Sequence, residues 1–162
     1  PVLLPVLRDT FKRNGQGGIR LMHGAVMQGE GGGNVAFQVP RAILGASLAR
    51  PGTPEHEVVE VPGLGLESLL YDHRPELVMM DIEGAEHAAL MGASQSIART
   101  RPIIHMEIGT PSLEAFGTKP DAIFDLLSCA EYELMSSPEK RSIEMIYPSM
   151  VPIKHFLYRS SS

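Results

Sequence analysis

One apolar run that ends in a group of carboxylates places the strongest constraint on how this chain can fold. Residues 76–82 are almost continuously apolar, as in a parallel strand that is covered on both faces. In residues 84–98, Gly84, Ala88 and Gly92 recur every four positions, which is typical of a helix with a narrow ridge that lies close to a sheet. A second apolar run follows at residues 103–108. The pattern therefore predicts a strand–helix–strand unit, with the usual right-handed crossover.

Acidic side chains gather where these two strands are expected to end. Asp81 and Glu83 follow the first run, and Glu107 closes the second. Ligands of open α/β sheets bind at the carboxyl ends of the strands, so these three residues are the candidate catalytic groups. A carboxylate there could position a hydroxyl group and accept its proton. The structural alternative is that these acids, with Glu86, hold free backbone amides at the start of the next helix.

Length and composition indicate one globular domain over residues 1–162. A chain of 162 residues can bury a core, and its 43% hydrophobic and 20% charged residues argue against a disordered or fibrous protein. Fourteen basic and nineteen acidic residues give a net charge of −5, with no basic run that could follow a phosphate backbone. Nucleic acid is therefore not an expected partner.

The chain shows no sign of a membrane segment. Its apolar opening, residues 1–7, is too short to cross a bilayer, and the basic residues follow it instead of preceding it. A single cysteine, Cys129, excludes an internal disulfide and a cysteine-cluster zinc site. We expect no membrane partner and a reducing, cytoplasmic compartment.

The rest of the chain alternates expected helices and strands. Residues 19–26 and 35–39 look like two strands of a hairpin, with the glycine-rich residues 29–33 at its tip. The other expected elements are helices over 3–13, from Leu66 and from Pro120, and strands over 56–61, 132–135 and 153–158.

Residues 77–108 resemble the signature of FkbM-type methyltransferases, which are class I enzymes dependent on S-adenosylmethionine. The resemblance implies an α/β, Rossmann-like sheet with helices on both faces. It also implies an O-methyltransferase that uses S-adenosylmethionine and acts on a hydroxyl group of a sugar or secondary metabolite. The residues that carry it are Asp81, Glu83-Gly84-Ala85-Glu86, Leu90, Gly92-Ala93, Arg101-Pro102 and Glu107.

The same resemblance assigns residues outside this run. It implies that His23, Gly24 and Ala25 end a strand near the adenine of the cofactor, and that Ser47 belongs to a substrate loop. The family's glycine loop and acidic strand end, which hold the rest of the cofactor, have no counterpart here. We therefore expect a partial methyltransferase domain without the first two strands of its sheet, with weak cofactor binding and a loss of activity on its own.

Two other functions stay open. A module that keeps the fold without catalysis could bind another chain, or form a homo-oligomer, through an exposed sheet edge. Carboxylates and imidazoles near the strand ends could instead hold a metal ion for hydrolysis. We predict no metal site, because the cysteine pair of a zinc deaminase is missing. The residues of that alternative are Asp81, Glu83, Glu86, His87, His105 and Glu107.

Overall fold

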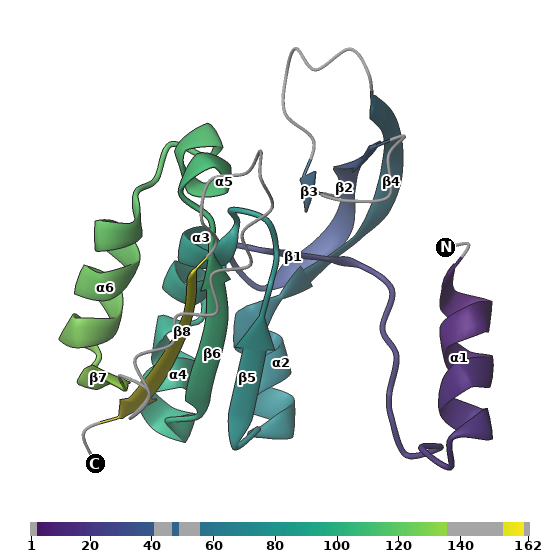
Figure 1. Ribbon diagram of the computed structural model, residues 1–162, viewed down its shortest axis with the longest axis horizontal. Helices are drawn as coiled ribbons and strands as arrows, with labels where there is room; N and C mark the ends of the chain where they lie inside the picture. Colours follow the sequence, from purple (N-terminus) through teal and green to yellow (C-terminus); the bar gives the residue numbers. More distant parts are fainter. Residues whose placement is uncertain (1–2, 41–46, 49–55, 136–153, 161–162) are drawn as a thin grey trace.

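Two four-stranded sheets organise the part of the chain that the computed structural model describes, residues 3–40, 47–48, 56–135 and 154–160 (Figure 1). The first sheet has the order β1-β4-β2-β3 and the second the order β5-β6-β8-β7. The helices are α1 (Leu3–Arg13), α2 (Leu66–His73), α3 (Glu86–Gly92), α4 (Ser94–Thr100), α5 (Thr110–Ala115) and α6 (Pro120–Cys129). The strands are β1 (Ala25–Met27), β2 (Gly31–Pro40), β3 (Ser47–Leu48), β4 (His56–Gly65), β5 (Leu77–Met80), β6 (Ile103–Ile108), β7 (Tyr132–Met135) and β8 (Lys154–Ser160).

The second sheet contains the predicted strand–helix–strand unit. Strands β5 and β6 are parallel neighbours, in register from Leu77 opposite Ile103 to Met80 opposite Met106. Strand β8 lies antiparallel to β6 and pairs in the same sense with β7, so the expected closing strands are confirmed. The chain is a mixed α/β protein, and the carboxyl ends of β5 and β6 lie at the same edge of the sheet.

The helix expected over residues 84–98 is interrupted. Helix α3 ends at Gly92 and α4 begins at Ser94, so the segment forms two short helices instead of one. The small residues buried against the sheet are Ala85, Ala89 and Ala93, one position after the predicted ridge. Gly92 instead lies against the backbone of the β1–β2 connection, where an added Cβ would stand 2.6 Å from the amide nitrogen of Gly29. Close approach of α3 to the first sheet therefore depends on this glycine.

The core lies on one face of the second sheet. Met80, Ile104 and Met106 are buried there, together with side chains from the helices, and each contributes about 1.5–3 kcal/mol by leaving water. On the opposite face, Leu77 is 56% exposed, Met79 is 74% exposed and Ile103 is 40% exposed. The expectation that helices cover both faces is therefore wrong for these strands within the described residues. The helical side chains of the core include Leu66, Leu70, Leu90, Ile97, Leu113, Ile123 and Leu127.

The first sheet differs from the predicted hairpin. Strand β1 pairs in parallel with β4, and β4 stands between β1 and β2. The glycine-rich residues 29–33 run into the start of β2 and do not form the tip of a β1–β2 hairpin. Gly31 has a φ of +81°, and an added Cβ would collide with the amide nitrogen of Gly65 in β4. These glycines allow two backbones to approach each other at the start of β2.

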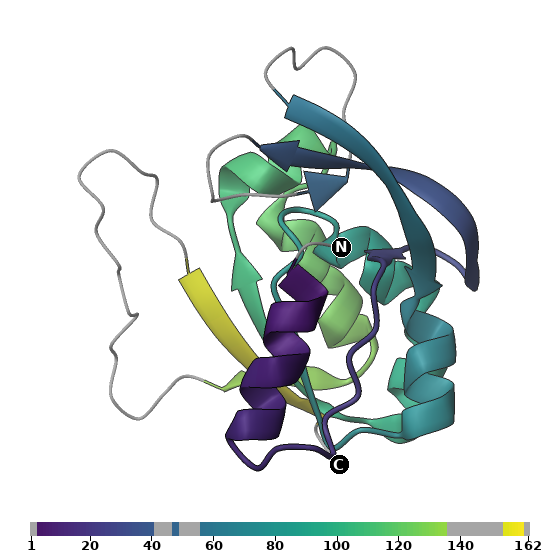
Figure 2. The same ribbon diagram turned by 90° about the vertical axis from the view of Figure 1, so that its right-hand side faces the viewer.

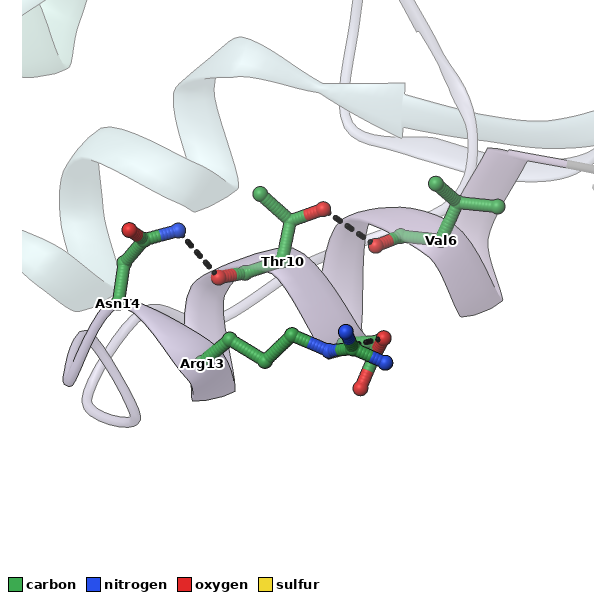
Figure 3. Close-up of polar contacts among 5 residues, drawn as sticks. Val6, Thr10, Arg13 and Asn14 are labelled. Atoms are coloured by element: carbon green, nitrogen blue, oxygen red, sulfur yellow. Dashed lines mark hydrogen bonds and ion pairs between the residues drawn. The ribbon is translucent and has the colours of Figure 1, made fainter.

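Helix α1 stands apart from both sheets in Figure 1, and Figure 2 views the molecule from the side on which α1 lies. At its C-terminal end the Asn14 side-chain amide donates a hydrogen bond to the Thr10 carbonyl at 2.8 Å, and the Thr10 hydroxyl donates to the Val6 carbonyl (Figure 3). Arg13 forms an ion pair of 2.7 Å with Asp9, one turn earlier. The helix is amphipathic as predicted, yet none of its residues is buried. No helix in the described ranges is long and apolar enough to cross a membrane.

Candidate functional site

The predicted catalytic acids lie at the carboxyl ends of β5 and β6. Met80 and Met106 form the last residue pair between β5 and β6, and Asp81 and Glu107 are the next residues along the chain. Both acids therefore fall on the sheet face opposite the core. Asp81 is exposed, and no residue in the described ranges donates a hydrogen bond to its carboxylate; Glu107 is half-buried and has an interaction partner. We refer to Asp81, Glu83 and Glu107 as the acidic edge.

A tight turn, residues 81–84, joins β5 to the segment before α3. Glu83 has a φ of +55° and Gly84 a φ of +104°, so two consecutive residues adopt the left-handed region. The Ser112 hydroxyl of α5 donates a hydrogen bond of 3.4 Å to Glu83 Oε2. An added Cβ on Gly84 would collide with the Ser112 carbonyl, so only glycine allows α5 to approach the turn this closely. The sequence pattern did not predict α5, and with it missed this outer support of the turn.

Glu86 is the buried carboxylate of this region, with 3% of its surface exposed. Its Oε1 accepts a hydrogen bond of 3.0 Å from the amide of Ile82, and its Oε2 accepts one of 2.9 Å from the amide of Gly84. Burial raises the pKa of Glu86 above its usual value, the negative charge of Asp81 adds to that rise, and the backbone hydrogen bonds oppose it. The structural alternative considered for these acids therefore describes Glu86 well.

The residues implied to bind cofactor and substrate lie in the first sheet or directly before its strand β1. His23 is exposed just before β1, Ala25 is the buried first residue of β1, and Ser47 lies in β3 opposite Gln38. Gly24 packs against β4: an added Cβ would stand 2.6 Å from the Leu64 side chain and equally close to the Pro62 carbonyl. The structure thus brings Asp81, Glu83 and Glu107 to one edge of the second sheet and places the other four candidates in or next to the first sheet.

The described residues offer contacts to only one part of S-adenosylmethionine, its adenine end. The exposed His23 ring and the backbone beside it could contact an adenine, whereas the space next to Gly24 is filled by β4. A cavity of about 290 Å³ lies elsewhere, between α1 and the segment that follows it, and is lined by residues between Arg8 and Leu21. None of the candidate site residues lines that cavity. His23 and the backbone of Gly24 and Ala25 are therefore the groups that could hold the adenine end of the cofactor.

The six residues of the metal alternative do not form a metal-binding cluster in the described part of the chain. All six residues proposed for it are described, and within the described ranges no three histidine, cysteine, aspartate or glutamate side chains gather closely enough to hold a metal ion. Glu86 uses both of its oxygens on backbone amides instead. Among the described residues, the acidic edge therefore supplies no metal-binding cluster.

Comparison with known proteins agrees with the signature found in the sequence. The family model described as "Methyltransferase FkbM domain" matches residues 21–134, a stretch that contains both parallel strands, the acidic edge and the residues near His23. No curated protein and no solved structure matches the chain. Enzymes of this family use S-adenosylmethionine and have a Rossmann-like fold, which agrees with the parallel β5–β6 pair seen here. The match spans well over half of the chain, which therefore belongs to the FkbM family of methyltransferases.

Proposed function

We propose that the chain acts as an O-methyltransferase domain in which Asp81 holds the acceptor hydroxyl and takes its proton. The observation that carries this proposal is the contrast among neighbouring acids. Glu83 and Glu86 are engaged by a hydroxyl and by backbone amides, whereas Asp81 is exposed and receives no hydrogen bond from the described residues. A carboxylate at the end of a parallel strand that accepts no hydrogen bond from the described residues is available to a ligand.

The chemistry asks little of the protein beyond placement. The cofactor supplies the methyl group, and the acceptor oxygen has to stand in line with it while its proton leaves. Asp81 would accept that hydrogen bond and then the proton. Glu107, next to it in register, adds negative charge at the same edge. Two carboxylates favour a neutral or cationic acceptor over a phosphorylated one. The sugar or secondary-metabolite hydroxyl that the family resemblance implies fits this preference.

The catalytic part of the proposal is tested by methyl transfer. The chain is incubated with S-adenosylmethionine carrying a labelled methyl group and with methyl glycosides as probe acceptors. We expect Asp81→Asn to lower kcat by about 10²–10⁴-fold, because the amide cannot take the proton. Glu114→Gln, on an exposed position of α5, is the matched control and should leave kcat unchanged. Wild-type kcat in the Asp81→Asn variant would remove Asp81 from the mechanism.

The cofactor part is tested separately by calorimetric titration. We expect weak but saturable one-to-one binding of S-adenosylmethionine, because the family's glycine loop is missing. His23→Ala should weaken it further, and His73→Ala should leave it unchanged, since His73 is an exposed histidine of α2 outside the site. Absence of heat at high cofactor concentration would mean that the described half-site does not bind the cofactor. That result would leave the family membership intact and contradict the enzymatic role of this chain.

A second candidate function rests on strand β5. It is an edge strand of its sheet, and its side chains Leu77 and Met79 are exposed next to Ile103 of β6. Apolar side chains on an open edge favour pairing, so an assembly module that joins a second copy of the chain through β5 is the alternative. Sedimentation equilibrium tests it: a dimer that Met79→Glu dissociates would support the module, and a monomer across the accessible concentration range would contradict it.

A further inference from the structure

We propose that Glu86 is a positioning residue of the acidic edge: it holds the 81–84 turn from the inside and thereby fixes where the Asp81 carboxylate stands. This inference rests on the proposed function of Asp81. It assigns the buried acid a role in placing the exposed one, and it follows from the geometry of two nearby peptide groups, those of the Ile82 and Gly84 amides. Glu86 itself would not contact the acceptor, because its side chain is buried and both of its oxygens are in use.

The hydrogen bond to Ile82 is the first link between the two acids. The Ile82 amide belongs to the same planar peptide group as the Asp81 carbonyl, so fixing this N–H fixes the plane that follows the Asp81 Cα. Glu86 Oε1 accepts that N–H at 3.0 Å. The direction of the Asp81 side chain depends on its backbone dihedral angles, and one of them is set by the orientation of this peptide plane.

The hydrogen bond to Gly84 closes the turn from the same side. Glu83 and Gly84 both adopt positive φ, a conformation that L-residues rarely adopt unless surrounding contacts hold it. Glu86 Oε2 accepts the Gly84 N–H at 2.9 Å, so one carboxylate binds the amides on both sides of Glu83. Hydrogen bonds to an ionised acceptor are the stronger kind, and here they replace the water that the buried amides would otherwise bind.

The outer side of the turn is supported less directly. Ser112 donates to Glu83 at 3.4 Å, a long hydrogen bond, and the Gly84 backbone packs against the Ser112 carbonyl and the Phe116 ring. Packing of this kind limits the volume open to the turn but does not orient a peptide plane. Glu86 is therefore the group whose removal should free the turn, and Ser112→Ala is the matched variant that removes one hydrogen bond from the other side.

Amide hydrogen exchange measured by NMR tests the role of Glu86. In Glu86→Gln the carboxamide keeps the size of the side chain but has one acceptor oxygen for two N–H groups. We expect the Ile82 and Gly84 amides to exchange roughly ten- to a hundredfold faster than in the wild type. A factor of this size corresponds to the free energy of one charge-assisted hydrogen bond. The Ile104 amide in the sheet should not change, and Ser112→Ala should leave all three near wild-type rates. Unchanged exchange at Ile82 and Gly84 would overturn the proposal.

A pH titration of the wild type provides a second readout that needs no variant. If one carboxylate binds both amides, their chemical shifts should move together with a single midpoint above the ordinary glutamate value of about 4.3. Burial and the charge of Asp81 raise the pKa of Glu86 in that direction. Separate midpoints for the two amides, or a shared transition that persists in Glu86→Gln, would assign the titration to another group and contradict the proposal.

Methyl transfer then separates the positioning role from the proposed function. With labelled S-adenosylmethionine and methyl glycoside probes, Glu86→Gln should lower kcat about tenfold or more while the KM for the cofactor stays the same, because the displaced group acts on the acceptor. A wild-type chain without activity would count against the proposed function, and the exchange result would still decide the role of Glu86. Faster exchange with unchanged kcat in an active enzyme would overturn the positioning role.

Discussion

Replacement of Glu67 by alanine should destabilise the chain through a helix that Glu67 does not belong to. Glu67 is in the first turn of α2, and its carboxylate reaches Ser96 in the first turn of α4. Oε2 accepts the Ser96 backbone N–H at 3.1 Å and Oε1 accepts the Ser96 hydroxyl at 2.8 Å. Helix α4 has no side-chain cap of its own, because the preceding residue is Ala93. Glu67 therefore supplies from another helix what an N-cap residue usually supplies locally.

The size of the effect follows from what the substitution leaves behind. Ser96 is fully buried, so its N–H would lose a charged acceptor without gaining water, at a cost of about 1–3 kcal/mol. Its hydroxyl would still reach the backbone carbonyl of residue 67, 3.3 Å away, so only part of that second hydrogen bond is lost. We expect a total of about 2–3 kcal/mol, which is a large fraction of the roughly 5–15 kcal/mol that stabilises a typical domain.

Thermal unfolding measures this loss directly. For a domain of this size, 2–3 kcal/mol corresponds to a fall in Tm of roughly 4–12 °C. Glu114→Ala, which removes an exposed glutamate from α5, controls for the change in charge and should shift Tm by less than about 1 °C. Glu67→Asp keeps the charge but shortens the reach, so its Tm should lie between the two. A Glu67→Ala variant with the Tm of Glu114→Ala would refute the inter-helix cap.

Two further predictions concern the turn and the far end of the second sheet. Gly84→Ala should lower the free energy of unfolding in urea by about 1–3 kcal/mol, because it combines strain at positive φ with a collision with Ser112. Gly117→Ala is the control: Gly117 has a φ of +72° and open space around it, so the loss should be smaller. Equal losses in the two variants would exclude the collision. The Tyr132 hydroxyl donates to the Pro102 carbonyl at 2.9 Å, and burial raises the pKa of Tyr132 to about 12. The unfolded chain therefore loses this proton first, so stability should fall as the pH rises from about 10 to 12, and Tyr132→Phe should lose part of that dependence.

The parts of the fold predicted from the sequence are those whose pattern is local and strongly periodic. The apolar runs that became β5 and β6 are short, bounded by turn residues and separated by one helical segment, so their parallel pairing follows from chain geometry. Helix α6 begins at Pro120 and buries Ile123 and Leu127 on one side, as its spacing indicates. In these segments propensity, periodicity and burial all favour the same structure.

The wrong predictions arise where a contact between distant parts of the chain determines the local structure. The helix after β5 breaks at Ala93 because Ser96 and Glu67 hold a new helix start, and that contact joins residues far apart in the sequence. The hairpin expected around residues 29–33 failed because β4, which comes later in the chain, occupies the place beside β1. Periodicity in one segment carries no information about which distant segment will pair with it.

The acids after β5 show the same limit at the scale of single side chains. Sequence reasoning placed Asp81, Glu83 and Glu86 at a strand end but could not tell a catalytic carboxylate from a structural one, because all three have the same chemistry. The left-handed turn at Glu83 and Gly84 distinguishes them: it brings the Ile82 and Gly84 amides to Glu86 and Glu83 to Ser112. Asp81, the first residue of the turn, is exposed and accepts no hydrogen bond from the described residues. This contrast is the reason why our proposal gives the proton-accepting role to Asp81.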